Sequence, residues 1–336
     1  MRRFVGLTWG LGLLMAVGGC AAAGSVPGSA VPGGATSGSA VDGSAVDGGA
    51  VGGDPGRQRE AFDERAAEVA GAWRPGPEWW SGYLPLQDAT VLTGQPGFDA
   101  GTEVAFRAGW YRDQIALPTA VPADGAIRFP DGALTVPLIS AAEAYRQLDQ
   151  GDPPPCEGRP RGPRPAEPTA GTRPDDPVST QAACIPLTVT GVTLGTAEVR
   201  TSRGVAAVPA WIFTVAELTS PVARLAVASR AVTAAPGASA PNRSLPVGVA
   251  GADQLRRVDG ARLTYTVGMG ACDSGPTALV RESDDVVVVG GGVVRGTGEC
   301  VDLAVLKPVT VTLAAPLGKR PVLDVATGRV LTLTAH

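Results

Sequence analysis

Residues 187–215, LTVTGVTLGTAEVRTSRGVAAVPAWIFTV, are the clearest β sequence in this chain. Apolar side chains alternate with small or polar ones, and the alternation shifts once, at Gly191, where a β-bulge is expected. The alternation is interrupted at Ser202-Arg203-Gly204, a sequence typical of a turn. A second strand pattern follows, with Trp211 and Phe213 on one face. With a further predicted strand at Val222–Val232, the stretch predicts a β-meander.

Two segments upstream of this meander have helical patterns. Over residues 58–73 apolar side chains recur on one face, and Pro75 ends the pattern. A second helix is predicted to begin at Ser140, which can form a capping box with Glu143, and to end at Gly151. The predicted buried positions are Phe62, Ala66, Val69 and Trp73 in the first helix, and Ala141, Ala144, Tyr145 and Leu148 in the second. The predicted strands are Thr90–Thr93, Glu103–Trp110, Ala126–Phe129 and Leu134–Leu138.

The C-terminal part repeats β patterns and contains no long helical pattern. Leu263, Tyr265 and Val267 alternate with polar residues, and Val286–Val289 is a continuous apolar run. Two apolar runs near the end flank the turn at Ala326-Thr327-Gly328, which predicts a hairpin. The expected fold class is therefore mainly β (α+β), with two β-rich domains. The first domain carries one or two helices, and the second is a small β-sandwich or open barrel.

Composition shifts along the chain predict its division into parts. A linker is expected at 233–242, where alanine, proline and glycine dominate. Gly-Ser-Ala-Val repeats near the N-terminus lack the large apolar side chains that a core requires. The predicted parts are a signal peptide at 1–19, a disordered tether at 20–57 that starts with a lipidated cysteine, a β-rich domain at 58–232 with a Pro-rich loop at 152–183, the linker, and a small β domain at 243–336.

The N-terminal sequence predicts export and lipid attachment. Arg2 and Arg3 precede an apolar stretch at Phe4–Val17, and Val17-Gly18-Gly19-Cys20 has the pattern of a bacterial lipobox. The apolar stretch is too short for a comfortable transmembrane helix. We therefore predict a lipid-modified Cys20. An ordinary secreted protein and an uncleaved anchor are the alternatives.

Four cysteines remain if Cys20 carries lipid. An even number of cysteines in an exported protein favours disulfides, and the predicted pairs are Cys156–Cys184 and Cys272–Cys300. These pairs have equal sequence separations, and each lies within one predicted domain. A four-cysteine metal site is the alternative, but the chain has no Cys-x-x-Cys. We expect no metal and no cofactor.

The composition excludes several kinds of chemistry. His336 is the only histidine, so a Ser-His-Asp or Cys-His catalytic site has no imidazole in the body of the chain. No Ser-x-x-Lys box occurs. The net charge is −4, and the basic residues are scattered, so nucleic acid is not an expected partner. Carboxylates are the remaining catalytic option, and no catalytic residue is assigned.

Two groups of residues are the candidate contacts. Trp79, Trp80, Trp110, Tyr111 and Arg203 are candidates for binding a ligand, although the aromatic group around Trp79 is more typical of a buried core. A second group precedes an apolar run and is the candidate for carboxylate catalysis, although a solvated turn is the simpler interpretation. This acidic group consists of Glu282, Asp284 and Asp285.

Two stretches resemble uncharacterised lipoproteins of actinobacteria. One is Leu187–Val215, especially Thr201–Gly204 and Val208–Trp211, and the other runs from Cys272 to Gly328. The resemblance covers most of residues 85–336. It implies a protein at the cell membrane, lipid-anchored on the extracytoplasmic face, and it implies no activity.

The sequence favours a non-enzymatic binding or interaction module at the cell surface. The reasons are the predicted export, the tether, the disulfide-linked β-rich domains and the lack of a recognisable set of catalytic residues. The membrane is the expected partner through the lipid anchor, with a cell-wall component or a protein as a further partner. A carboxylate-dependent hydrolase of cell-wall polysaccharide is the alternative function. A structural or assembly lipoprotein with only protein partners is a third.

Overall fold

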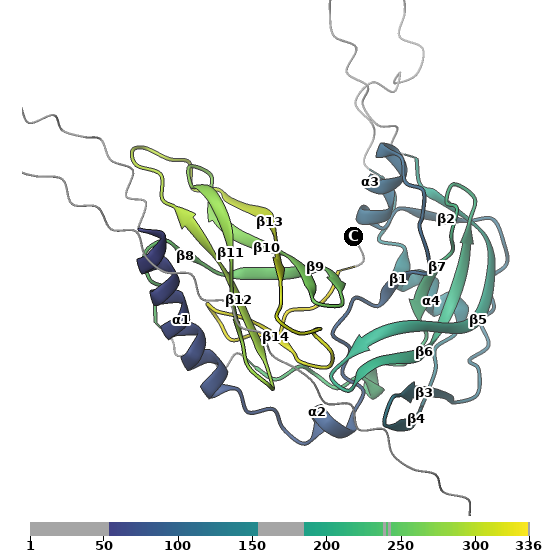
Figure 1. The fold of residues 1–336 in the computed structure, drawn as a ribbon. Helices are drawn as coiled ribbons and strands as arrows, with labels where there is room; N and C mark the ends of the chain where they lie inside the picture. The colour runs from purple at the N-terminus through teal and green to yellow at the C-terminus, as the bar shows by residue number, and fades with distance from the viewer. Residues whose placement is uncertain (1–53, 154–184, 238–239, 241–242, 335–336) are drawn as a thin grey trace, which may run out of the picture. The chain divides into compact units, whose positions relative to one another are not determined.

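The computed structural model describes residues 54–153, 185–237, 240 and 243–334, all within one compact unit (Figure 1). The described residues form mainly strands with a few helices, so the expected mainly β fold class is confirmed. The strands form a seven-stranded, a three-stranded and a four-stranded sheet. None of the described helices combines the length and the apolar character that crossing a membrane requires.

The hairpin predicted at 187–215 forms the centre of the seven-stranded sheet. Strands β5 (Leu187–Thr201) and β6 (Gly204–Val215) pair antiparallel, with a register shift between Val189 and Gly191. The predicted turn and the predicted bulge at Gly191 are therefore confirmed. Gly204 closes the turn with a φ of 106°, a backbone conformation that favours glycine.

The other strands of this sheet are short. The order is β1-β7-β6-β3-β4, with β5 on β6 and β2 on β5. Only the first part of the strand predicted at Val222–Val232 forms, because the chain turns into a short 3-10 helix at Ser229–Ala231. The bounds are β1 (Thr90–Leu92), β2 (Tyr111–Asp113), β3 (Gly125–Phe129), β4 (Gly132–Val136) and β7 (Val222–Leu225).

Helix α4 (Ala141–Leu148) is the predicted helix after Ser140. The Ser140 hydroxyl accepts a hydrogen bond from the Glu143 N–H, and the four predicted apolar positions are buried. Half of the predicted capping box is thus present. The helix packs its apolar face into the core of the seven-stranded sheet.

Helix α3 (Ala100–Ala108) contradicts the strand predicted at Glu103–Trp110. Asp99 and Thr102 form a reciprocal capping box, and Gly109 ends the helix in the left-handed conformation with a φ of 68°. Glu103 and Arg107 add an ion pair at i,i+4 spacing. The prediction was wrong because these capping signals outweigh the β propensity of the valine and aromatic residues in the segment.

The C-terminal part forms two small sheets that share one core, in agreement with the expected small sandwich. One sheet has the order β13-β10-β9, and the other has β11-β12-β14 with β8 beside β12. Tyr265 and Val267 of β10 and Val287 and Val289 of β12 lie in the shared core. The strands are β8 (Val249–Ala250), β9 (Ala252–Asp259), β10 (Arg262–Gly270), β11 (Ser274–Glu282), β12 (Val287–Val294), β13 (Ala304–Thr312) and β14 (Val322–Asp324).

The two sheets approach each other closely at Gly291 of β12. A Cβ at Gly291 would lie 2.4 Å from a methyl carbon of Val267, so the glycines of β12 allow this approach. The disulfide Cys272–Cys300 joins the turn after β10 to the segment before β13, as predicted. By the loop-entropy account, such a bridge stabilises the fold by about 3–4 kcal/mol. The other predicted bridge, Cys156–Cys184, lies outside the described residues.

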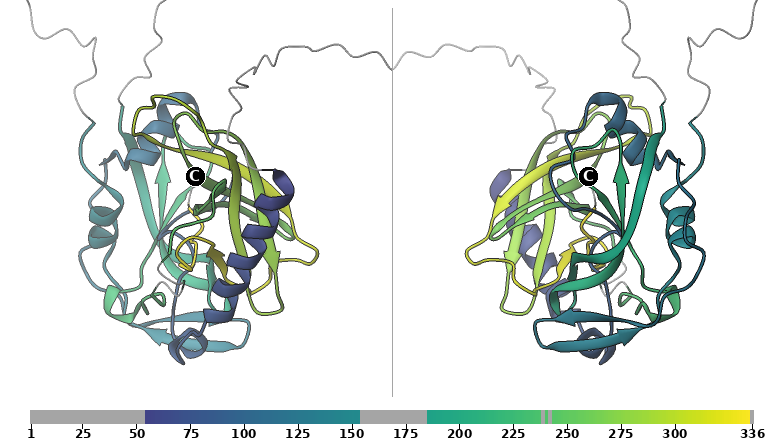
Figure 2. Two further views of the ribbon diagram at one scale, coloured as in Figure 1. Left: turned by 90° about the vertical axis from the view of Figure 1, so that its left-hand side faces the viewer. Right: turned by 90° about the vertical axis from the view of Figure 1, so that its right-hand side faces the viewer.

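Helix α1 (Pro55–Ala72) has the buried face that the sequence predicted, including Phe62 and Val69. This face packs against β8, β11 and β12, as Figure 1 and Figure 2 show for the purple helix. The resulting core also includes Val288 and Leu323. The helix therefore completes a core with strands that follow it by about two hundred residues. The limits of the two domains remain a prediction from the sequence.

A buried carboxylate holds the C-terminal hairpin. Asp324 is 4% exposed, and its oxygens accept hydrogen bonds from the N–H groups of Ala252, Ala326 and Thr327 and from the Thr327 hydroxyl, at 2.7–3.1 Å. The carboxylate thus ties the turn between β14 and Val330 to the start of β9. Such hydrogen bonds to a charged acceptor are stronger than those between neutral groups.

We predict that Asp324→Ala lowers the free energy of unfolding by about 3 kcal/mol, because it leaves the buried Ala252 N–H and the turn donors without their acceptor. Asp324→Asn keeps one side-chain oxygen and should lose less. Urea denaturation followed by circular dichroism measures the change. Asp253→Ala, at an exposed position of β9, is the control, and an equal loss in both alanine variants would contradict the prediction.

Candidate functional site

A pocket of about 320 Å³ brings together two of the predicted aromatic candidates and two of the predicted acidic ones. Three tryptophans come from the segment that follows α1, two aspartates from the turn between β11 and β12, and two basic residues from the loop before β14. The pocket is thus built from both ends of the described chain. These lining residues are Trp73, Trp79, Trp80, Asp284, Asp285, Lys319 and Arg320.

The one-turn helix α2 (Glu78–Ser81) buries one of its two tryptophans and exposes the other. Trp79 is 2% exposed, and its ring meets Trp73 edge-on with the centroids 5.2 Å apart. Trp80 is 56% exposed. The core interpretation therefore holds for Trp79, and for the buried Tyr83, but not for Trp80. A large indole in contact with solvent beside a pocket is available to a ligand.

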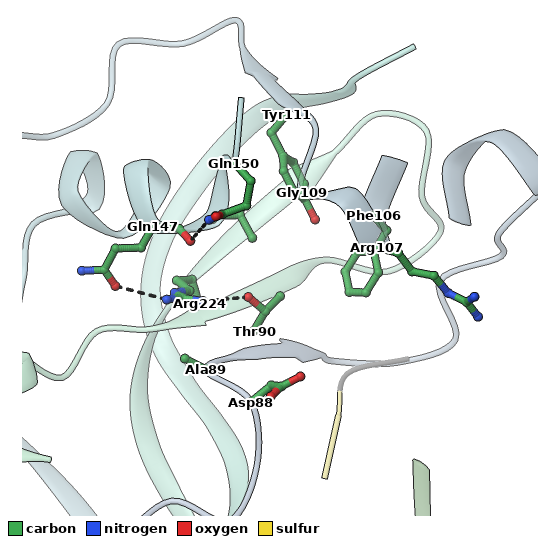
Figure 3. A pocket seen from close by; sticks show the side chains of 11 residues that line it. Asp88, Ala89, Thr90, Phe106, Arg107, Gly109, Tyr111, Gln147, Gln150 and Arg224 are labelled. Atoms are coloured by element: carbon green, nitrogen blue, oxygen red, sulfur yellow. Dashed lines mark hydrogen bonds between the residues drawn. The ribbon is translucent and has the colours of Figure 1, made fainter. Parts of the chain in front are cut away.

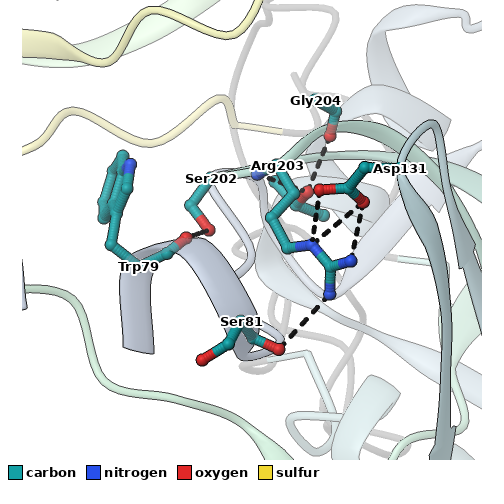
Figure 4. Close-up of polar contacts among 7 residues, drawn as sticks. Trp79, Ser81, Asp131, Ser202, Arg203 and Gly204 are labelled. Carbon is teal, nitrogen blue, oxygen red and sulfur yellow. Dashed lines mark hydrogen bonds and ion pairs between the residues drawn. The ribbon is translucent and has the colours of Figure 1, made fainter. Parts of the chain in front are cut away.

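Arg203 holds α2 in place. At the tip of the β5–β6 hairpin, its guanidinium donates to the Ser81 carbonyl, pairs with Asp131 at 2.6 Å and lies 3.8 Å from the Phe129 ring centroid (Figure 4). The Ser202 hydroxyl donates to the Trp79 carbonyl at 2.7 Å. The hydrogen bond from Arg203 lowers the pKa of the Asp131 carboxyl below its ordinary value.

The Arg203 side chain is only 11% exposed. Its guanidinium is engaged by Ser81, Asp131 and Phe129, so the structure places this candidate contact residue in a supporting position. Trp110 and Tyr111 lie elsewhere, because Tyr111 is buried in β2 and Trp110 packs partly buried against the core of the seven-stranded sheet. Of the predicted aromatic contacts, Trp79 and Trp80 are the two that line this pocket.

The three predicted acids divide into two kinds. Asp284 and Asp285 are exposed in a turn that Ser283 closes with hydrogen bonds to the Val286 carbonyl. The Glu282 carboxylate instead accepts from the Ala314 N–H at 2.7 Å and from Arg320 at 3.1 Å. Glu282 therefore holds the loop before β14, and only the two aspartates line the pocket.

Lys319 and Trp73 are lining residues that the sequence analysis did not identify. Lys319 is exposed at the pocket, whereas the neighbouring Arg320 donates to four carbonyls of Ser283 and of residues 315–317. Arg320 thereby shapes the loop that presents Lys319. No local sequence pattern could predict that Lys319 and Trp80 line the same pocket, because only the folding of distant segments places them there.

The described residues contain no group of three or more histidine, cysteine or carboxylate side chains arranged to hold a metal ion. Cys20, Cys156 and Cys184 lie outside the described residues. Searches of protein-family models, of curated proteins and of solved structures found no match for this chain.

Proposed function

We propose that this chain is a lipid-anchored extracytoplasmic protein that binds cell-wall polysaccharide, without catalysis, through the pocket beside Trp80. The observation that carries the proposal is the exposed Trp80 indole at a pocket that also holds Asp284, Asp285 and Lys319. An aromatic face packs against the C–H face of a sugar ring, while charged and polar groups hydrogen-bond to its hydroxyls. The lipobox and the resemblance to actinobacterial lipoproteins support the location.

The position of the acids favours binding over hydrolysis. In a glycosidase, one carboxyl group is commonly kept protonated by an apolar environment, and a second faces it across the scissile bond. Asp284 and Asp285 are adjacent in one exposed turn, and Glu282 is held by Arg320. The carboxylate-dependent hydrolase therefore has less support than the binding module.

We predict that Trp80→Ala weakens binding to purified cell-wall polysaccharide by about tenfold or more, because it removes the exposed aromatic surface of the pocket. The free energy of unfolding should change little, since the side chain is largely exposed. Cosedimentation with insoluble wall material measures the affinity. Leu194→Ala, which truncates another exposed apolar side chain on β5, is the matched control.

Three outcomes would contradict this proposal. Equal binding by the wild type and Trp80→Ala would remove the pocket from the interaction. Release of reducing sugar by the wild type, abolished in an Asp284→Asn, Asp285→Asn double variant, would favour the hydrolase instead. Capture of a protein, with no retention on wall material, would favour an assembly role.

A further inference from the structure

A second pocket, of about 240 Å³, lies against the seven-stranded sheet and helices α3 and α4 (Figure 3). Its lining includes four polar residues from different elements: Thr90 of β1, Tyr111 of β2, Gln147 of α4 and Arg224 of β7. No pattern in the sequence predicted this pocket. It shares no lining residue with the pocket beside Trp80.

Arg224 presents a partly buried positive charge to this pocket. Its guanidinium donates to the Thr90 hydroxyl at 3.0 Å and to the Gln147 side-chain oxygen at 3.3 Å. Both acceptors are neutral. The Arg224 Nε–H is buried and has no acceptor among the described residues. A charged group that is withdrawn from water is usually paired with an opposite charge, so these neutral hydrogen-bond partners leave the guanidinium charge only partly compensated.

The electrostatic surroundings agree with this geometry. Burial lowers the pKa of Arg224, and the nearby Asp88 carboxylate opposes that shift. Arg200 offers a comparison, because burial lowers its pKa to about 10 and its guanidinium donates to the carbonyls of Gly318 and Arg320. Arg200 lines neither pocket, whereas Arg224 lines the pocket of about 240 Å³ and is therefore within reach of a ligand there.

Tyr111 adds a second polar group that lacks a partner. Tyr111 lines the same pocket, and its hydroxyl is buried and makes no hydrogen bond with the described residues. In Figure 3 the hydroxyl end of the ring points toward Phe106 and Gly109, inside the group of lining residues. An unsatisfied buried hydroxyl destabilises the fold, and an acceptor that entered the pocket would remove this penalty.

We propose that this pocket binds a small molecule through its carboxylate group, with Arg224 and Tyr111 as the donors. A guanidinium presents its N–H groups in a planar fork that matches a carboxylate, and the hydroxyl supplies a further donor. Asp88 also lines the pocket, so a singly charged carboxylate suits it better than a doubly charged phosphate. The volume limits the ligand to a small molecule.

The test titrates the full-length chain with sodium lactate and sodium acetate by isothermal titration calorimetry, against sodium chloride at the same ionic strength. We expect saturable binding of at least one carboxylate, weakened about tenfold or more in Arg224→Gln because a charged hydrogen-bond donor is lost. Tyr111→Phe should weaken binding severalfold without lowering stability, because the hydroxyl it removes has no partner. Arg230→Gln, at an exposed position after β7, should bind like the wild type.

Three results would overturn the proposal. One is the absence of saturable binding of both carboxylates to the wild type. Another is undiminished binding by a Tyr111→Phe and Arg224→Lys double variant, which also covers the case in which Arg224→Gln fails to fold. The third is tighter saturable binding of inorganic phosphate than of either carboxylate, which would contradict the preference for a singly charged group. Trp80→Ala should leave lactate binding unchanged, so failure here is distinguishable from failure of the polysaccharide proposal.

Discussion

Phe62→Ala is expected to lower the free energy of unfolding by about 3–5 kcal/mol, the range for truncating a fully buried phenylalanine. The Phe62 side chain is 0% exposed and lies in the core between α1 and the sheet of β11, β12 and β14. Its ring covers Gly290 so closely that a Cβ there would lie 3.2 Å from a ring carbon. Alanine would leave a cavity that the rigid sheet cannot fill.

Chemical denaturation of the wild type and the variant measures this loss. Glu64→Ala is the matched control, because it changes an exposed side chain in the same helix and should alter stability by less than about 0.5 kcal/mol. If Phe62→Ala lost no more than the control, α1 would not pack on the C-terminal sheet as described. Loss of hydrogen-exchange protection in β12 of the Phe62→Ala variant would provide independent support for this packing.

Cys20→Ala is expected to move the protein from the membrane fraction to the soluble fraction of the cell. The prediction follows from the lipobox, since without the thiol no lipid can be attached at this position. Each methylene group of an acyl chain that enters the bilayer contributes about 0.8 kcal/mol, so losing the chains removes most of the membrane affinity. Fractionation followed by immunoblotting measures the distribution.

Trp80→Ala serves as the control for this experiment, because it keeps Cys20 and should remain with the membranes. Mass spectrometry of the N-terminal peptide should find an acyl modification on Cys20 in the control. Unchanged membrane partition of Cys20→Ala would refute lipid anchoring. An unmodified N-terminus in a soluble wild type would instead indicate an ordinary secreted protein.

The local predictions succeeded where neighbouring residues determine the conformation. The β5–β6 hairpin, the shift at Gly191 and helix α4 depend on alternation, turn residues and capping within a few positions. The strand predicted at Glu103–Trp110 was wrong although its signals were equally local. The capping box of Asp99 and Thr102 and the terminal Gly109 lie at the limits of that segment, and they determine a helix.

The pockets could not be predicted in the same way. Trp79 and Trp80 are identical neighbours in the sequence, and only the packing of α2 against the hairpin tip buries one and exposes the other. In the sequence, Arg224 reads as an exposed position of a short strand. In the folded chain, Gln147 of α4 accepts a hydrogen bond from its guanidinium. Contacts between residues far apart in the chain leave no periodic signal that a single sequence can reveal.

The amino-acid order was thus sufficient for the β-rich fold class, the central hairpin and the buried faces of α1 and α4, because backbone propensity and hydrophobic periodicity act over a few residues. Only the folded chain decided what α1 packs against and which distant residues line each pocket. Trp80 lines one pocket with Asp284 and Lys319, and Arg224 lines the other. The physical origin of these arrangements is the burial of apolar surface between distant segments, a gain that depends on complementary shapes and not on neighbouring residues.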